Sequence, residues 1–443
     1  MDDLIKVGYG RADITPDAPV PLGGYGNSIG RTNEVVRDPL FATCLAFTDN
    51  KDQTVLVYTT DALYAPIELI NQVRDILCPE LGLERHQIQV ASTHSHSTPD
   101  MTLVDIPAIA DCRAKYVEAL CAAAREAMAD RAPAIAYIGS VQTCGMNFIR
   151  HYMMTDGSYA GANFGDKTLP VAKHASTSDP WMQIIKFARL QGEDITLVNF
   201  QAHPCFTGGI NAKVLSADYI GDMRRYVEEQ THTRFAFFQG AAGNHNGFSY
   251  LASETRFNDS TGYGEELGKY VVGALPGLRH VNADNIFCNK RTLTLEIDHS
   301  DDWMVPQCLK IQAEWEKNHD RDASNAQAKA IGLNSIYAVL SLISRSKLEQ
   351  TCAMEIYSLR VGDLGFIFAP YEMFGVNGEF IKDFAPYPMT FVVTCANDRQ
   401  SYLASELAFS HGCYEVDSRR YPKGTAELLA NNFVEMLTEL KNQ

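Results

Sequence analysis

Two histidines one residue apart, His94 and His96, have the types and the spacing that most clearly indicate chemistry in this chain. They follow a short apolar run at residues 88–93, and Pro99 ends regular structure soon after. In an extended backbone, residues i and i+2 point to the same side, so both imidazoles would aim at one point. The pattern indicates a metal site or a proton-transfer site. The structural alternative is that one histidine caps the strand end while the other faces solvent.

Three further residues with metal-binding side chains, His203, Glu372 and Tyr402, also come shortly after apolar runs. Open α/β sheets place their ligand sites beyond the carboxyl ends of their strands. Histidine nitrogens and a carboxylate match the ligands of catalytic zinc, which keeps one position open for water. Taken singly, the three also fit a core histidine, an acid at a helix N-terminus and a core tyrosine. Their convergence favours a zinc site. The runs that precede them are residues 195–200, 366–369 and 391–396.

The elements that must position these residues alternate between strands and helices. The pattern predicts an α/β fold, with a mixed β-sheet core, flanking helices and the metal site at the carboxyl ends of strands. We expect one catalytic domain over residues 1–443, irregular structure at 158–180, and a helical hairpin over the sheet at 301–350. The predicted hairpins are 41–47 with 54–60, 182–189 with 195–200, and 354–361 with 364–369. The clearest helices are 112–129, 217–229 (with Ser216 as N-cap) and 424–441.

A turn at residues 240–247 follows the buried run 235–239 directly. Free backbone N–H groups in such a turn are suited to holding an oxyanion or a substrate oxygen. Gly240 and Asn244 are therefore predicted to bind substrate. Asp61, Cys205 and His245 lie close to these motifs and are expected to have supporting or structural roles.

Composition narrows the class of protein. The 443 residues are 46% hydrophobic and 21% charged, as in globular proteins, and the formal net charge is −16. This charge and the absence of a basic run argue against a nucleic-acid partner. There is no signal-peptide pattern and no apolar stretch of the roughly 18 residues that a membrane span needs. Eleven scattered cysteines without a Cys-x-x-Cys indicate reduced thiols. We expect a soluble cytoplasmic protein without membrane insertion, whose oligomeric state the sequence does not fix.

Several of these motifs resemble the catalytic domain of the neutral (alkaline, non-lysosomal) ceramidases and their shorter bacterial relatives. The segment 93–99 is similar to the family's Thr-His-x-His-Ser-x-Pro, and Pro370-Tyr-Glu372 to its Pro-Gly-Glu. Tyr402 and Tyr414 reproduce two family tyrosines 12 residues apart (414 − 402), with a glutamate after the second. The opening segment 10–16, Gly-Arg-Ala-Asp-Ile-Thr-Pro, is also similar.

The resemblance implies a zinc-dependent amidohydrolase. In such an enzyme, zinc lowers the pKa of a bound water towards about 7 and polarises the carbonyl. His96 would transfer the proton, while Tyr414 and Arg150 would contact the oxygen of the scissile group. The implied zinc ligands are His94, His203, Glu372 and Tyr402.

Departures from the family pattern change the expected substrate. Residues 240–245 read Gly-Ala-Ala-Gly-Asn-His where the family has Gly-Asp-Val-Ser-Pro-Asn, so no role for that serine transfers. The family's C-terminal β-sandwich has no counterpart, and Arg150 matches only loosely. A small N-acyl amide is therefore the expected substrate, rather than ceramide. A zinc ester or lactone hydrolase and a non-catalytic metal-binding protein are the alternatives.

Overall fold

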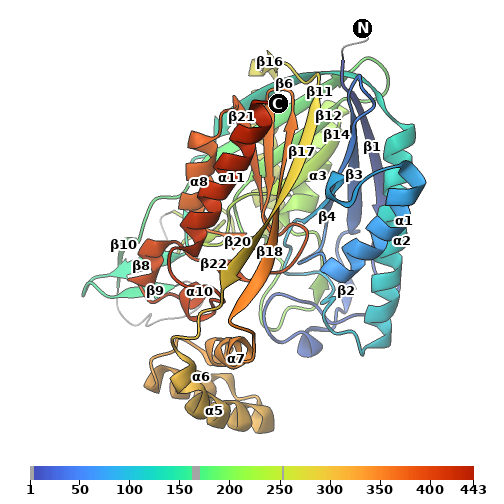
Figure 1. Cartoon of the computed structure of the whole chain (residues 1–443). Helices are drawn as coiled ribbons and strands as arrows, with labels where there is room; N and C mark the ends of the chain where they lie inside the picture. The colour runs from blue at the N-terminus through green and yellow to red at the C-terminus, as the bar shows by residue number, and fades with distance from the viewer. Residues whose placement is uncertain (1–3, 162–169, 252–253) are drawn as a thin grey trace.

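The computed structural model describes residues 4–161, 170–251 and 254–443, which form four layers: helices, a large sheet, a smaller sheet and helices (Figure 1). The predicted mixed α/β fold is confirmed. Within the described residues the large sheet has nine strands in the order β14-β12-β11-β6-β1-β3-β4-β5, and β16 pairs with β6. Their bounds are β1 (Lys6–Asp13), β3 (Phe41–Thr48), β4 (Thr54–Thr60), β5 (Ile88–Ser92), β6 (Ala132–Gln142), β11 (Trp181–Arg189), β12 (Ile195–Phe200), β14 (Arg234–Gln239) and β16 (Arg279–Val281).

The smaller sheet packs on one face of the large sheet through an apolar core to which both contribute. Its order is β17 (Ile286–Glu296), β18 (Thr351–Val361), β19 (Leu364–Phe368) and β21 (Met389–Val393). Period-two alternation sorts the side chains of each strand. In β12, Leu197 faces this inter-sheet core, whereas Val198 and Phe200 pack with helices on the other face.

Helices cover both outer faces (Figure 1). The tightest approach is between α2 and β1, where a Cβ added at Gly8 would lie 1.9 Å from the carbonyl oxygen of Ala127. Small residues at this contact therefore let the helix lie directly on the sheet. On the large sheet lie α1 (Ile67–Leu81), α2 (Pro107–Ala129), α3 (Tyr219–Thr231) and α4 (Ser260–Ala274), and on the smaller sheet α8 (Gly375–Phe384) and α11 (Thr425–Lys441).

The three predicted hairpins are confirmed as the antiparallel pairs β3–β4, β11–β12 and β18–β19. The predicted N-cap of α3 was wrong. Asp218 caps this helix, because its Oδ1 accepts a hydrogen bond of 2.8 Å from Tyr219 N. Ser216 instead hydrogen-bonds to Asp38 and to the backbone N–H of Asp218.

The segment 158–180, predicted to be irregular, contains two short strands, β9 (Tyr159–Gly161) and β10 (Val171–His174), which flank β8 (His151–Met154). Residues 162–169 of that segment lie outside the described residues.

The segment 301–350 forms three helices instead of a hairpin. They are α5 (Val305–Asn318), α6 (Arg321–Ala330) and α7 (Ile336–Arg345), which share an apolar cluster of their own beyond the ends of the sheets (Figure 1). That the chain is one catalytic domain stays a prediction.

Three parallel strand pairs direct their carboxyl ends towards the candidate site. They are β4–β5, β12–β14 and β19–β21. A bridge between Ala91 and Ala396 ties the large sheet to the loop that follows β21. None of the helices in the described part of the chain is long and apolar enough to cross a membrane.

Candidate metal centre

His94 and His96 lie in a turn after β5, where they do not continue the strand. The strand ends at Ser92, and His94 has φ of +68°, in the left-handed region. The extended-strand geometry predicted for the pair is therefore wrong. The turn nevertheless brings the two Nε2 atoms to 3.3 Å from each other. Left-handed backbone at a residue other than glycine costs on the order of 1 kcal/mol or more, and such conformations cluster at functional sites.

His203 and Glu372 complete a buried cluster with these two histidines. Glu372 begins the short strand β20 (Glu372–Met373), which pairs in parallel with β22 (Tyr402–Leu403). Its Oε2 lies 3.2 Å from His94 Nε2 and 3.1 Å from His203 Nε2. Zinc–nitrogen bonds of about 2.0–2.1 Å in a tetrahedron place neighbouring donor atoms roughly 3.4 Å apart. The donor set and its spacing therefore fit a zinc ion.

The second nitrogen of each imidazole distinguishes the three histidines. Nδ1 of His94 lies 3.0 Å from the carbonyl oxygen of Leu63, and Nδ1 of His203 lies 2.7 Å from that of Ala242. A carbonyl only accepts, so each Nδ1 carries a proton, and Nε2 is the nitrogen that each imidazole would offer to a metal ion. Metal-binding histidines are almost always held in this way. Nδ1 of His96 is buried and has no hydrogen-bond partner among the described residues.

Burial and neighbouring charges set the protonation of the cluster. Burial, with the nearby His94, holds the pKa of His96 well below its ordinary value. Burial and the Arg150 guanidinium lower the pKa of His203 to about 4. Burial alone would raise the pKa of Glu372, but the facing His94 and His203 hold it well below its ordinary range. Burial alone would lower the pKa of His94, but Cys395 and Glu372 raise it well above its ordinary value. The site without metal therefore presents a carboxylate, a protonated His94, and neutral His96 and His203 near pH 7.

Arg150, Tyr402 and Tyr414 lie beside the cluster, on the wall of a cavity of about 820 Å³. Arg150 Nη1 is 3.3 Å from His203 Nε2, and its Nε donates to Glu415 Oε1 at 2.7 Å. The guanidinium carbon lies 5.4 Å from the ring centroid of Tyr402, whose ring is 6.0 Å from that of Tyr414. The structure thus brings together all seven residues predicted as metal ligands or catalytic groups, and their individual roles stay predictions.

Gly240 and Asn244 lie outside this group. Both are buried, and neither is among the residues that line the cavity. Asn244 Oδ1 accepts a hydrogen bond of 2.9 Å from Gly375 N at the start of α8, and Gly240 O accepts one of 2.7 Å from Thr394 Oγ1. Their predicted contact with substrate stays untested, and these bonds favour a structural role.

His245 and Asp61, expected to support the site, have clear partners. The carbonyl oxygen of His245 accepts the backbone N–H of His203 at 3.1 Å, which fixes the segment that carries that histidine. Asp61 forms a buried ion pair of 2.9 Å with Arg224.

Three aromatic or cationic residues near the cluster escaped the sequence analysis. Tyr64 donates to Glu372 Oε1 at 2.8 Å, and the Arg399 guanidinium lies 4.6 Å from the Tyr64 ring centroid. Tyr25 packs its ring edge-on against His96, 5.2 Å away. The available signal was positional, because Tyr64 and Arg399 follow the same strand ends, β4 and β21, that precede Asp61 and Tyr402.

The Gly-rich loop at residues 22–27 closes over His96. Gly24 has φ of +105°, and a Cβ there would lie 2.7 Å from Cγ of the His96 imidazole. Arg31, fully buried, donates to the carbonyl oxygens of Gly23 (2.7 Å) and His96 (2.9 Å). Glycine is therefore required where the loop meets the histidine.

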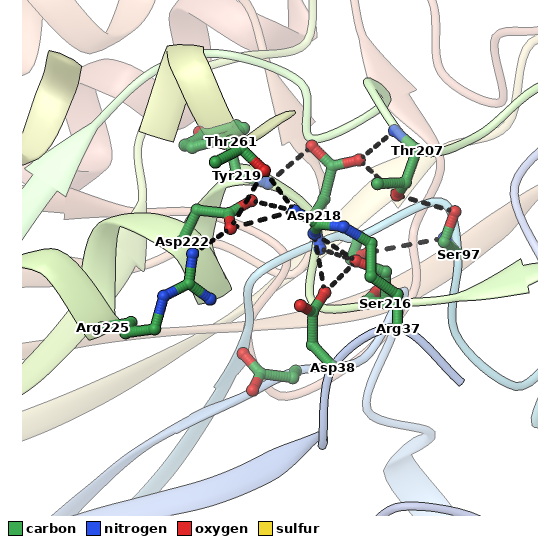
Figure 2. A network of polar contacts seen from close by, with 12 residues as sticks. Arg37, Asp38, Ser97, Thr207, Ser216, Asp218, Tyr219, Asp222, Arg225 and Thr261 are labelled. Carbon is green, nitrogen blue, oxygen red and sulfur yellow. Dashed lines mark hydrogen bonds and ion pairs between the residues drawn. The ribbon is translucent and has the colours of Figure 1, made fainter. Parts of the chain in front are cut away.

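A buried polar network anchors the other side of the histidine turn (Figure 2). Ser97 O accepts a hydrogen bond of 2.9 Å from Ser216 N, and Ser97 Oγ accepts one of 3.1 Å from Thr207 Oγ1. The backbone N–H of Thr207 donates to Asp218 Oδ2 at 2.7 Å. Because Asp218 caps α3, the turn is fixed to the start of that helix.

Comparisons with known proteins agree with the resemblance noted in the motifs. No protein-family model and no curated protein matches the chain. Among solved structures, neutral ceramidase from Pseudomonas aeruginosa matches over 100% of this chain and 75% of its own, with 17% identity and a TM-score of 0.74. A ceramidase complexed with C2 matches over 99% of this chain and 75% of its own, with 16% identity and a TM-score of 0.73. The chain therefore has a neutral ceramidase-like fold.

Proposed function

We propose that this protein is a zinc-dependent hydrolase that uses water to cleave the C–N amide bond of a small N-acyl substrate. The observation that carries the proposal is the buried cluster of three imidazoles and one carboxylate beside the cation Arg150, on the wall of a large cavity. The likeness to proteins named as ceramidases supports amide cleavage over other hydrolytic reactions.

His94, His203 and Glu372 are the proposed metal ligands, with Tyr402 as the fourth. The two histidines have the backbone-anchored Nδ1 typical of ligands, and Tyr64 orients the carboxylate. Zinc held there would supply Lewis-acid polarisation of the scissile carbonyl and a water acidic enough to ionise near pH 7.

His96 is the proposed proton-transfer residue. Its Nε2 faces the cluster, and its lowered pKa keeps it neutral, so it can accept a proton from the attacking water. The same nitrogen then returns the proton to the leaving amine. Because no described residue bonds to its Nδ1, His96 lacks the anchor that His94 and His203 have.

Arg150 and Tyr414 are proposed to stabilise the oxyanion. Glu415 bonds to the guanidinium of Arg150 and holds it in place before substrate binds. A cation oriented in advance stabilises developing negative charge without reorganisation cost during the reaction. Tyr414, on the same cavity wall, supplies a hydroxyl.

The same groups would attack an ester or lactone, and the metal set alone would serve a non-catalytic protein. His96 and Tyr414 favour an enzyme, because neither is needed merely to hold the ion. A cytoplasmic location and the lack of nucleic-acid partners remain predictions from the sequence.

Metal analysis and a paired amide and ester library test the proposal. We expect about one zinc per chain and amide hydrolysis that His94→Ala and Glu372→Ala abolish together with metal binding. His96→Ala should keep the zinc and lose turnover. His280→Ala, at an exposed position on β16, is the matched control.

Three outcomes count against the proposal. Esters cleaved with amides untouched would support the esterase. Tight zinc without turnover of any acyl substrate would support a binding protein. Protein without metal that tolerates both substitutions would overturn the proposal altogether.

A further inference from the structure

Among the described residues that line the cavity beside the cluster, arginines outnumber carboxylates, although the chain as a whole is acidic. The formal net charge is −16, yet six arginines and two carboxylates, Asp100 and Glu372, are the charged lining residues that the described part of the chain provides, apart from the histidines. Its volume of about 820 Å³ is within the usual range for small-molecule sites, which is roughly 300–1,000 Å³. The arginines are Arg150, Arg321, Arg345, Arg399, Arg419 and Arg420.

Carboxylates of the protein neutralise some of these arginines. Arg150 pairs with Glu415. Arg419 pairs with Asp298 and Asp301, at 2.5 Å each, and Arg345 lies 3.4 Å from Asp301. These three arginines therefore have structural partners already.

Arg399 and Arg420 have no such partner. Among the described residues, neither forms an ion pair with a carboxylate. Arg420 Nη1 donates at 2.7 Å to the neutral side-chain oxygen of Gln400, and Arg399 lies over the ring of Tyr64. Arg399 is exposed as a residue and lines the cavity.

The two cavity carboxylates already accept other bonds. Glu372 contacts His94, His203 and Tyr64. The negative charge of Asp100 favours the charged form of Arg399. Its Oδ2, however, accepts a hydrogen bond of 2.6 Å from Ser28, and its Oδ1 accepts one from Thr102. Among the described residues, neither carboxylate forms an ion pair with Arg399 or Arg420.

Arg399 is also close to the candidate reaction centre. Tyr64 contacts both Arg399 and Glu372, so one aromatic ring separates the guanidinium from the metal cluster. Arg399 lies shortly before Tyr402 in the chain, and Arg420 bonds to Gln400 between them. If the amide of a substrate is held at the cluster, a substituent a few atoms away from that amide would lie near these arginines.

We infer that the substrate is an amide that carries an anionic group, a carboxylate or a phosphate, and that Arg399 and Arg420 bind this group. The inference rests on the proposed function and names the substrate class for it. Guanidinium groups bind carboxylate and phosphate oxygens in pairs and in fixed geometry. A neutral lipid amide would leave both cations without a counter-charge.

Matched anionic and neutral amides test the inference on the zinc-loaded protein. Hexanoyl-glycine, which has its charge on the amine side of the amide, is compared with neutral hexanoyl-glycinamide. N-butylsuccinamic acid, which has its charge on the acyl side, is compared with neutral N-butylsuccinamide. Hexanoyl-phosphoethanolamine tests phosphate. We expect kcat/KM to be about 10- to 100-fold higher for the preferred anion than for its neutral partner, the range for a hydrogen bond to a charged group.

Variants assign the preference to residues. Arg399→Gln and Arg420→Gln should each lower kcat/KM for the anionic amide by about 10-fold or more and change the neutral amide by less than about 3-fold. Arg399→Lys should recover part of the loss. Arg279→Gln is the control, since Arg279 is exposed on β16 at the end of the molecule opposite to α5–α7 (Figure 1).

The outcomes separate this inference from the proposed function. Equal rates for anionic and neutral amides, or equal losses for both in the variants, would overturn the inference and leave the hydrolase intact. No hydrolysis of any amide would overturn the function. Calorimetric binding of hexanoyl-glycine and hexanoyl-glycinamide then decides the inference alone, because equal affinities would refute it.

Discussion

Replacing Glu372 by glutamine should weaken zinc binding while keeping the shape of the site. Glutamine retains an oxygen that can accept the hydrogen bond from Tyr64, which the carboxylate now accepts at 2.8 Å. It removes the negative charge that lies 3.2 Å from His94 Nε2 and 3.1 Å from His203 Nε2. The perturbation is therefore electrostatic and acts on a single candidate ligand.

The expected magnitude follows from linkage between binding and folding. Zinc present at 1,000 times its Kd stabilises the fold by about 4.1 kcal/mol. Loss of a charged ligand should weaken zinc affinity by about 100-fold or more. Replacing a residue that only hydrogen-bonds to a metal ligand already weakens metal affinity by about 10- to 100-fold. If the Kd rises 100-fold at the same zinc concentration, the stabilisation by zinc falls to about 1.4 kcal/mol. Unfolding 443 residues has an entropy of about 0.9 kcal/mol/K, so the zinc-induced rise in Tm should shrink by about 3 °C.

Differential scanning calorimetry with and without zinc, together with metal content after dialysis, measures this effect. Glu84→Gln is the matched control, because Glu84 is exposed, lies 3.2 Å from His86 and should leave the zinc-induced shift unchanged. A Glu372→Gln protein with wild-type metal content and an undiminished shift would refute the assignment of this carboxylate as a ligand.

Two further predictions concern the loop over His96 and the contact between α7 and α10 (Tyr414–Asp417). Gly24→Ala should lower amide turnover by about 10-fold or more, because the new methyl group displaces the His96 ring. Gly424→Ala, with a similar positive φ and open space around it, should affect stability only, and equal activity losses would contradict the reasoning. Burial raises the pKa of Asp417, which accepts two hydrogen bonds from Asn334, to about 6. The stability that this carboxyl contributes is therefore fully present below about pH 4 and lost as pH rises through about 6, by at most about 3 kcal/mol. Urea unfolding at pH 4 and pH 7.5 should show this loss in the wild type and not in Asp417→Asn; parallel pH profiles would disprove it.

The order of elements was predictable because local pattern determines it. Strands such as β12 alternate between two apolar faces. His203 and Glu372 each follow a strand of a parallel pair, and the carboxyl ends of the two pairs face one site. The positions of residues at strand ends can be predicted without knowing how the loops are folded. The sequence therefore predicted which of these residues lie close together, while their roles as ligands stay predictions.

Contacts made by loops could not be predicted in the same way. The left-handed turn at His94 depends on hydrogen bonds to Ala62 and Pro204 from distant segments. Tyr64 and Arg399 meet only because the two sheets pack together, and no local spacing encodes that packing. The three helices at 301–350 have helical periodicity, but their position beyond the sheets depends on contacts across the fold.

The candidate site lies where the two sheets meet, and this has a consequence for how the protein matures. Tyr64 and Glu372, which share a hydrogen bond, are 308 residues apart in the chain. The three histidines come from the half that is synthesised first, and the carboxylate and Tyr402 from the half synthesised last. Contacts of such long range form late and slowly. A nascent chain would therefore expose an incomplete, imidazole-only pocket, and an ion captured after the second sheet docks would bind the two halves of the chain together.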